Sequence, residues 1–565
     1  MIKKILIVVF FLFVSLIYLH NLTRDIYSGD LGDLVTAAYV GGVAHPPGYP
    51  LFTFLGLILS RLPIPIPVVS KVGLISIFSS LLALIFYYKY TLKVSKSIYL
   101  GLLCTSILAF SYFFWLNAEI PEVFALNNFF IVILLYLAFQ FFKSKKVKYL
   151  YFLAFFLGLS LTHHHTIILI FPALAYLIRK HLKIILKKKT IFLCLMLFLL
   201  GISVYLYVPI AASRNPVINW DSATNLKNFI HLVSRKDYGV VTLGKSQGIV
   251  PQSTKMIILK NYLQTIVSTY SFQVVFVFLL GLVYLFFKDR KLFFSLFVAS
   301  LLTGPLFIFY SAYVATSSAS LGILERFYTL SAVTFMFFVP FGFIIIKNFL
   351  NKKLSSPIFS YIELSYFFIV PIFLYKFNFP KTDLSKTQIG NELALDVFST
   401  LPKNSVFFAT GDTITFNTWY LRYVLKERAD IEIINPPGVG NNIYLDKEIN
   451  EYYKKNPKVS LRDIVSKTFE VIRSKKPIFT TQQIPNVSKD ALLMPKGLIF
   501  ELVDKKNLPS EEDYLKNIED NLKRLHIKRR DRLNISELNF ITPEIPLIYS
   551  NAFVRVGDFL IAQYK

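Results

Sequence analysis

Two aspartates stand three residues apart near the N-terminus, directly after a first apolar run. Asp30 and Asp33 belong to the segment SGDLGD, and His45 and Tyr49 belong to the proline-rich segment HPPGYP. Carboxylates at this spacing can share one face of a helical turn. Such a pair can divide its roles, with one group accepting a proton while the other orients a reacting group. The alternative interpretation is a helix cap in a solvated loop.

Further polar residues stand where apolar runs end. Glu119 and Glu122 flank a proline at such a boundary, where a carboxylate is costly unless it is paired. A site role and a helix cap both fit them. His164 and His165 look like a metal pair, but adjacent helical residues point about 100° apart, and no cysteine cluster or HExxH spacing accompanies them. We predict that they form hydrogen bonds within the protein or to a sugar. No cofactor is predicted, and a divalent metal is compatible with the histidines but not indicated by them.

Arginines at the ends of apolar runs are candidates for holding an anion. Arg326 is the first choice for a phosphate, because a guanidinium can hold two phosphate oxygens at once. An ion pair with an acid is the alternative. Arg214 and Arg235 are second choices in the segment of about 212–268. The remaining candidate substrate-binding residues of that segment are Asn219, Trp220 and Tyr238.

Membrane helices must position these residues. The chain has 565 residues, of which 54% are hydrophobic and 17% charged, with a mean hydropathy of +0.53. Soluble domains contain about 25% charged residues. Apolar runs of about 18 to 22 residues recur through the first two thirds and are long enough to cross a bilayer. We expect about eleven spans, at residues 4–20, 69–91, 97–116, 123–142, 149–162, 166–178, 191–211, 270–287, 292–312, 327–347 and 357–376.

The net charge of +27 is a topology signal rather than a sign of nucleic-acid binding. Lysines and arginines cluster between alternate apolar runs, and short basic loops stay in the cytoplasm. They also attract anionic membrane lipids. An odd number of spans then puts everything after residue 375 outside the cytoplasm. The two cysteines lie inside apolar runs and predict neither a disulfide framework nor a metal site.

The expected architecture has two domains. Residues 1–376 form an α-helical polytopic membrane domain with outer loops at about 21–68, 212–268 and 313–326. From residue 377 to 565, shorter apolar runs alternate with helical patterns, which predicts an extracytoplasmic α/β domain. We expect strands at 406–409, 431–434 and 498–503 and helices at 416–426 and 461–473. Asp412 follows the first strand and is interpreted as a cap of the next helix through Thr415.

These motifs carry a family resemblance. The segment GDLGDLVTAAY from Gly29, followed by GVAHPPGYPL from Gly42, resembles a family once catalogued as a membrane domain of unknown function. That family includes the animal transmembrane O-mannosyltransferases that modify plexin-type receptor domains, and it resembles GT-C glycosyltransferases. Further matches are Trp115, Ala118-Glu119, Glu122 to Asn127, Gly158 to Thr162, His164 to Thr166, Leu206 to Ile210, Asn219-Trp220, Arg235, Tyr238-Gly239, Arg326 to Tyr328, Gly411-Asp412 and Trp419-Tyr420.

The match is dense to about residue 240 and patchier to about 435. The family usually carries Glu where Asp33 stands and Asn where His163 stands. The resemblance implies a GT-C-like fold and an inverting transfer of a sugar, mannose or another hexose, from a polyprenyl-phosphate donor. The acceptor would be a hydroxyl of a protein Ser/Thr or of a glycan.

On this reading Asp30 is the expected base, with Asp33 as partner or second candidate, and desolvation is expected to raise the pKa of Asp30 toward that task. The expected location is the bacterial inner membrane with a periplasmic or extracellular active face, or the endoplasmic reticulum membrane in a eukaryote. A transporter or flippase of lipid-linked sugar is the main alternative, and a non-catalytic assembly or receptor protein is the third hypothesis.

Overall fold

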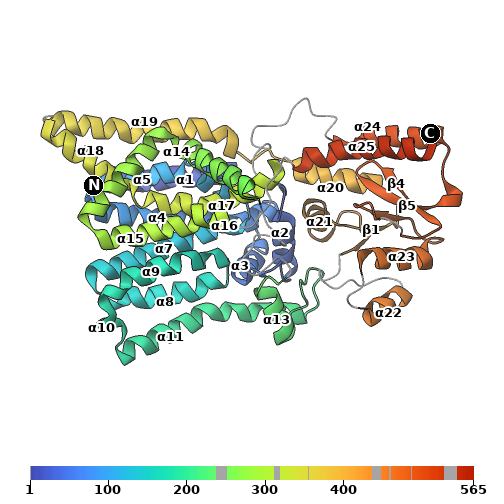
Figure 1. The fold of residues 1–565 in the computed structure, drawn as a ribbon, viewed down its shortest axis with the longest axis horizontal. Helices are drawn as coiled ribbons and strands as arrows, with labels where there is room; N and C mark the ends of the chain where they lie inside the picture. Colours follow the sequence, from blue (N-terminus) through green and yellow to red (C-terminus); the bar gives the residue numbers. More distant parts are fainter. Residues whose placement is uncertain are drawn as a thin grey trace.

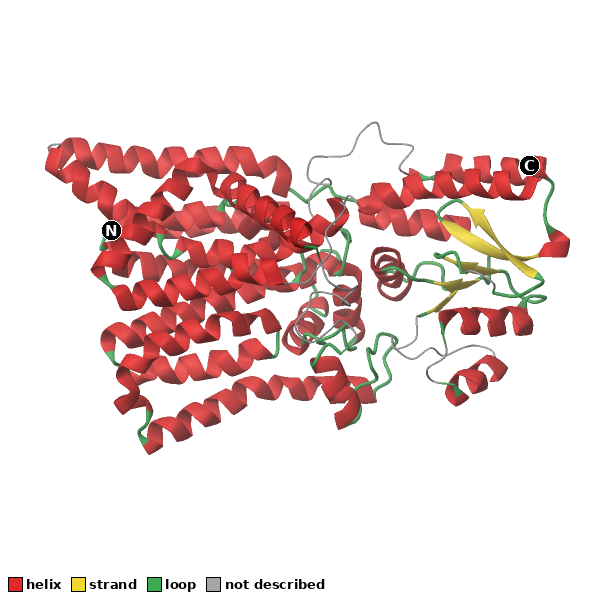
Figure 2. Cartoon of the chain, in the orientation of Figure 1, coloured by secondary structure: helices red, strands yellow, loops and turns green. Residues whose placement is uncertain are grey.

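The computed structural model describes most of the chain. Figure 1 shows an elongated molecule with a bundle of long helices at one end and a smaller region at the other, which contains the C-terminus. In Figure 2 the strands lie in this C-terminal region and the bundle is helical. The described residues are 2–236, 251–310, 318–353, 356–435, 447–456, 460–484, 487–526 and 544–564.

Long apolar helices make up the bundle. They are α1 (Ile2–Asn21), α4 (Val68–Ser95), α5 (Ile98–Ala109), α6 (Tyr112–Ala118), α7 (Val123–Ser144), α8 (Val147–Leu161), α9 (Phe171–Ile178), α11 (Lys188–Ile202), α12 (Tyr207–Ser213), α14 (Gln252–Lys288), α15 (Arg290–Thr303), α16 (Pro305–Tyr310), α17 (Ser318–Met336), α18 (Val339–Lys353) and α19 (Ser356–Thr382). Short pieces connect them: η1 (His165–Ile170), η2 (Arg179–His181), α10 (Leu182–Ile185) and η3 (Ser203–Leu206).

Fewer helices are long enough to cross a membrane than the sequence predicted. Among the described residues, eight helices are long and apolar enough to cross a membrane, or nine if the bent pair α5 and α6 counts as one span. The spans predicted at 149–162 and 166–178 form a helical hairpin, but its helices α8, η1 and α9 are each shorter than a full span. One of the eight is α25 (Glu544–Tyr564), which packs against the C-terminal sheet rather than in the bundle.

Three short helices cover the end of the bundle that faces the C-terminal region. They are α2 (Leu31–Val40), α3 (Pro50–Ser60) and α13 (Leu226–Val233) (Figure 1). The chain segments before α3 and α13 meet where the N–H of Val43 donates to the carbonyl of Ile218 at 3.0 Å. The two loops therefore form one layer.

The C-terminal region is built on a five-stranded sheet of order β2-β1-β3-β5-β4. Strand β1 is parallel to β2 and β3, whereas β5 is antiparallel to β3 and β4. The strands are β1 (Val406–Phe408), β2 (Glu432–Ile434), β3 (Ile478–Thr480), β4 (Ala491–Lys496) and β5 (Ile499–Asp504). The helical elements beside α25 are α20 (Ile389–Thr400), α21 (Asp412–Trp419), η4 (Tyr420–Val424), α22 (Lys447–Lys455), α23 (Leu461–Ile472), η5 (Lys505–Asn507) and α24 (Glu511–Arg524).

The predicted α/β pattern is confirmed at its three strands and two helices. Two strands were missed. Strand β3 has only three residues, and β4 contains Pro495, which argues against a strand in the sequence. β4 lies at the sheet edge, where a proline is tolerated because no ladder hydrogen bond is needed on its outer side.

One continuous apolar core joins the bundle to the C-terminal region. It runs from the membrane helices through α20 and α21 to Phe407 and Phe479, while the opposite side of the sheet has a separate core under α23. One close approach between the two regions is that of α2 and α21. A Cβ on Gly32 would lie 2.3 Å from the backbone of Phe416, so only glycine fits there. This contact holds α21 against the helix that follows Asp30.

Candidate functional site

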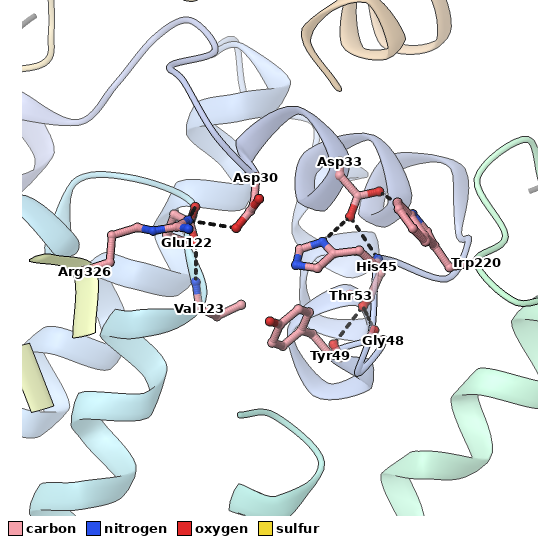
Figure 3. A network of polar contacts seen from close by, with 10 residues as sticks. All are labelled: Asp30, Asp33, His45, Gly48, Tyr49, Thr53, Glu122, Val123, Trp220 and Arg326. Carbon is pink, nitrogen blue, oxygen red and sulfur yellow. Dashed lines mark hydrogen bonds and ion pairs between the residues drawn. The ribbon is translucent and has the colours of Figure 1, made fainter. Parts of the chain in front are cut away.

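The first part of the site is an ion-pair cluster on three elements. Arg326 of α17 donates from Nη1 to Oδ2 of Asp30 at 2.8 Å and lies 3.5 Å from Oε1 of Glu122. Asp30 precedes α2, and Glu122 caps α7 by accepting from the N–H of Val123 at 3.2 Å. The side chains of Arg326 and Glu122 are 10% and 3% exposed, whereas that of Asp30 is 23% exposed. Asp30 is therefore the most accessible member (Figure 3).

The second part is centred on Asp33, whose carboxylate is fully buried. Oδ2 of Asp33 accepts from the backbone N–H of His45 at 3.0 Å and lies 2.7 Å from Nδ1 of the same residue. Oδ1 accepts from Nε1 of Trp220 at 3.0 Å. Asp33 thus fixes the His45 ring and joins it to Trp220 in the outer loop at about 212–268. Figure 3 shows that the two aspartates point different ways, Asp30 toward Arg326 and Asp33 toward Trp220.

The electrostatics of the two parts differ from the expectation for Asp30. Burial opposes ionisation of this carboxyl, but the charges of Arg326 and His45 outweigh burial and lower its pKa. The predicted rise of the Asp30 pKa was therefore wrong, because the prediction took account of desolvation but not of the charge of Arg326. Burial raises the pKa of Glu122 to about 7, against the opposing effect of Arg326.

His45 is held as a cation. Burial opposes its charge, but the hydrogen bond to Asp33 and the charges of Asp30, Asp33 and Glu122 raise its pKa to about 9. At neutral pH the site therefore contains an imidazolium and a guanidinium beside the carboxylate of Asp30. The ring of Tyr49 packs edge-on against His45 with centroids 5.1 Å apart.

The three histidines of the hairpin all form hydrogen bonds to groups of the protein, which is one of the two alternatives predicted for His164 and His165. Nε2 of His163 donates to the carbonyl of Val123 at 2.7 Å, and Nδ1 of His164 accepts from the N–H of Thr166 at 3.2 Å. Nε2 of His165 lies 3.2 Å from the hydroxyl of Tyr205. Burial lowers the pKa of both His163 and His165 to about 4, so they are neutral. The ring of His164 lies 5.8 Å from that of Tyr49, which brings the hairpin to the edge of the site.

The other predicted residues divide into near and distant groups. The charge of Arg235 affects the pKa of Asp30 and of His164, so it lies beside the site. Asn219 is buried in the layer next to Trp220 and donates to the carbonyl of Ala212 at 3.2 Å. Arg214 is exposed at the end of α12, and the structure gives it no contact with the cluster. Tyr238 lies outside the described residues.

Glu119 is separated from the cluster. It is fully buried, accepts a hydrogen bond from Nε1 of Trp115, and burial raises its pKa well above the ordinary value. The Trp115 ring stacks on Tyr375 at 5.6 Å. These residues pack α6 against α19, which fits a structural role rather than contact with a substrate.

The C-terminal region contributes residues that the sequence did not assign to the site. The ring of Phe416 stacks on His45 with centroids 6.4 Å apart, and the N–H of Gly29 donates to Oγ1 of Thr413 at 3.4 Å. Thr413 in turn donates to Oε2 of Glu544 at 2.6 Å. The turn at Gly411 after a buried strand was the available signal, because ligands of α/β sheets bind beyond the carboxyl ends of strands.

The predicted cap at Asp412 is wrong. Gly411, with a φ of 83°, occupies the cap position of α21, and Asp412 is the first helical residue. In the described part of the chain, no side chain forms a cap hydrogen bond at the start of this helix. Across the described residues, no group of three or more His, Cys, Asp or Glu side chains is placed to hold a metal ion.

The chain is similar to a named family over its N-terminal part. Residues 30–185 match the model of the protein O-mannosyl-transferase TMEM260 N-terminal domain. A relative from Dictyostelium discoideum, protein O-mannosyl-transferase tmem260, is 28% identical over 470 residues, which are 75% of this chain and 56% of that protein. The protein of the same name from Mus musculus is 28% identical over 455 residues, covering 77% and 63%. The chain thus matches less than two thirds of the length of either relative.

Solved structures share the fold. The crystal structure of ArnT from Cupriavidus metallidurans in the apo state aligns with a TM-score of 0.54 and 8% identity, covering 89% of this chain and 98% of that one. The structure of the same protein bound to undecaprenyl phosphate gives the same TM-score and coverage with 10% identity. The resemblance predicted from the sequence is therefore confirmed: the protein has a GT-C-like fold and is similar to the TMEM260 family of protein O-mannosyl-transferases.

Proposed function

We propose that the protein is a membrane glycosyltransferase that moves a sugar, mannose or another hexose, from a polyprenyl-phosphate donor to a hydroxyl acceptor. The observation that carries the proposal is the pairing of Asp30 with Arg326 at the end of the bundle, beside the cationic His45. A carboxylate can accept the acceptor's proton, while the two cations can stabilise a phosphate. The names of the relatives support a sugar transfer to protein, and the undecaprenyl phosphate bound in the ArnT structure supports a lipid phosphate.

The proposed reaction is a single displacement at the anomeric carbon. The acceptor oxygen forms a bond to that carbon while the bond from carbon to phosphate oxygen breaks, so the configuration inverts. The electron pair leaves with the lipid phosphate, and the acceptor's proton goes to Asp30. Asp33 orients His45, and Glu122 holds the opposite side of Arg326.

Donor binding would activate the base in this scheme. In the structure Arg326 lowers the pKa of Asp30 and so weakens it as a base. The buried Nε of Arg326 has no hydrogen-bond partner among the described residues, so this guanidinium can still donate to a phosphate. A phosphate that engages Arg326 competes with Asp30 and brings negative charge near it. Both effects raise the pKa of Asp30 once the donor is in place.

We propose that the site opens to the extracytoplasmic side of the membrane, on a chain with a membrane domain at 1–376 and an α/β domain at 377–565. Basic loops between alternate apolar runs support this topology. The bacterial inner membrane, or the endoplasmic reticulum membrane in a eukaryote, is the proposed location. The proposed acceptor is a Ser/Thr hydroxyl of a protein, with a glycan hydroxyl as the alternative.

A transporter or flippase of lipid-linked sugar is the alternative function. It would hold polar groups near the middle of the bundle, on discontinuous helices. The Asp30 cluster instead adjoins α2 at one end of the bundle, next to the C-terminal region (Figure 1). This position favours the enzyme.

The test is an assay of sugar release from radiolabelled polyprenyl-phosphate-mannose by the purified protein in detergent. Wild type is expected to consume the donor, and Asp30→Asn is expected to lose at least about 100-fold, since a general base contributes roughly 10²–10⁴-fold. Asp490→Asn is the matched control, because Asp490 is an exposed aspartate of the C-terminal region.

Equal turnover by wild type and Asp30→Asn would exclude Asp30 as the base and point to Glu122. If wild type consumes no lipid-linked sugar while reconstituted vesicles translocate one, the transporter replaces the enzyme.

A further inference from the structure

The start of α21 brings one more carboxylate to the site. Asp412 follows β1 and Gly411, and its side chain is exposed although the helix behind it is buried. Among the described residues, the structure gives this carboxylate no hydrogen bond and no ion pair. Its position next to Asp30 is nevertheless fixed by its neighbours.

Two contacts fix it. Thr413 accepts from the N–H of Gly29, the residue before Asp30, at 3.4 Å. One helical turn later the backbone of Phe416 lies against Gly32, and the Phe416 ring stacks on His45. Because α21 is held to α2 on both sides of Asp30, Asp412 cannot move far from that residue without breaking the contact between the two regions.

The site has the cation of Arg326 on its bundle side and the carboxyl groups of Asp412 and Glu544 on the side of the C-terminal region. Burial by neighbouring protein and the charges of Asp30 and Glu544 raise the pKa of Asp412 to about 6, while His45 and Arg326 oppose the rise. Asp412 is therefore ionised at neutral pH. Arg326 on the bundle side attracts a phosphate, whereas Asp412 and Glu544 on the other side repel one.

We propose that Asp412 is a specificity-determining residue that contacts the acceptor, and that it selects acceptor peptides without acidic residues beside the Ser/Thr hydroxyl. The proposal rests on the function proposed above. An exposed carboxylate accepts hydrogen bonds from backbone N–H groups and hydroxyls and attracts lysine or arginine. It disfavours a flanking aspartate or glutamate, because like charges brought together cost free energy. Asp412 lies at the start of α21 in the C-terminal region, whereas Arg326 belongs to α17 of the bundle, and the negative charge of Asp412 suits the acceptor rather than the phosphate of the donor.

The experiment compares three synthetic peptides that differ only beside one Ser/Thr, with Lys, Gln or Glu at that position. The full-length protein in detergent transfers labelled mannose from polyprenyl-phosphate-mannose, and kcat/KM is measured for each peptide. Wild type should prefer Lys over Gln over Glu by about threefold per step, as expected for a partly exposed charge pair.

Asp412→Asn should remove the preference, Asp412→Lys should reverse it, and Asp412→Glu should keep it. The control Asp490→Asn should keep the wild-type ranking. Because the readout is a ratio between peptides, a general loss of folded protein does not change it, and the Asp412→Glu variant covers the case in which Asp412→Asn does not fold.

Outcomes that overturn the inference differ from those that overturn the function. No preference in wild type, or an unchanged preference in Asp412→Asn, overturns the role of Asp412. Donor consumption without transfer to any peptide overturns the peptide acceptor and leaves the glycosyltransferase in place. If wild type consumes no donor, the proposed function itself fails, and the role of Asp412 fails with it.

Discussion

Arg326 and Asp30 are 296 residues apart in the chain, and their side chains form an ion pair of 2.8 Å. Glu122 lies on the other side of the same guanidinium at 3.5 Å. One buried cation therefore serves two carboxylates from two different helix starts. Removing it would leave both carboxylates without their ion-pair partner, which is costlier than losing an exposed pair.

We predict that Arg326→Gln lowers kcat for sugar release by about 100-fold or more, the size of effect seen when one electrostatic stabiliser of a transition state is removed. The thermal midpoint should also fall. Adding Asp30→Asn to Arg326→Gln should recover part of the stability, because one unpaired charge disappears. Lys143→Gln is the control, since Lys143 forms an exposed ion pair with Asp289 at 2.7 Å. A loss of activity in the control as large as in Arg326→Gln would contradict a specific role.

The charge of His45 predicts the alkaline limit of activity. His45 must be protonated to stabilise a phosphate, and its pKa is about 9, so kcat/KM should fall as the pH rises through about 9. Asp33→Asn removes the main group that raises this pKa, and the alkaline limit should move to lower pH. A pH profile of the two proteins tests this. An unchanged limit in Asp33→Asn would mean that another group titrates.

The same group makes stability depend on pH. The pKa of His45 is raised in the folded protein from 6.5 to about 9. The stabilisation is therefore complete below about pH 6.5 and is lost as the pH rises through about 9. The loss is up to about 3 kcal/mol for a shift of this size. His45→Gln should lack this part of the pH dependence of the thermal midpoint, and an identical dependence in both proteins would count against the assignment.

The contact between α2 and α21 predicts an intolerance to side chains at Gly32. In Gly32→Ala the new Cβ would overlap the backbone of Phe416, so the C-terminal region must shift away from Asp30. We expect a lower thermal midpoint and a loss of transfer. Gly557→Ala is the matched control, because its Cβ would have open space around it and alanine favours the helix. Equal stability of the two variants would show that α21 is not held at Gly32.

Glu119 should behave differently from Glu122. Burial raises the pKa of Glu119 well above its ordinary value and so favours the protonated carboxyl, which resembles an amide. Glu119→Gln should keep most of the stability and activity, whereas Glu122→Gln should lower activity because Arg326 loses a partner. Measuring the thermal midpoint and the donor turnover of both variants tests whether the two glutamates have these different roles. A stronger effect at Glu119 would place that residue in the reaction.

Local sequence determined several parts of this protein. Apolar runs require a lipid-facing helix because backbone groups must be satisfied within it, and alternation of short strands with helices indicated the C-terminal sheet. The segment around Asp30 and Asp33 was identified because polar residues and a proline-rich turn follow directly on an apolar run. These are properties of neighbouring residues, which the sequence displays.

Tertiary packing decided how those residues interact. Asp30 and Asp33 are three residues apart in sequence, yet one pairs with Arg326 and the other with His45 and Trp220. Glu119 and Glu122 look equivalent in the chain, but burial raises the pKa of Glu119 well above its ordinary value, whereas Glu122 lies 3.5 Å from Arg326. The local sequence predicts Asp412 as a helix cap, but in the folded structure Gly411 occupies the cap position. Charge and pKa depend on distances between segments hundreds of residues apart, and only the folded structure sets those distances.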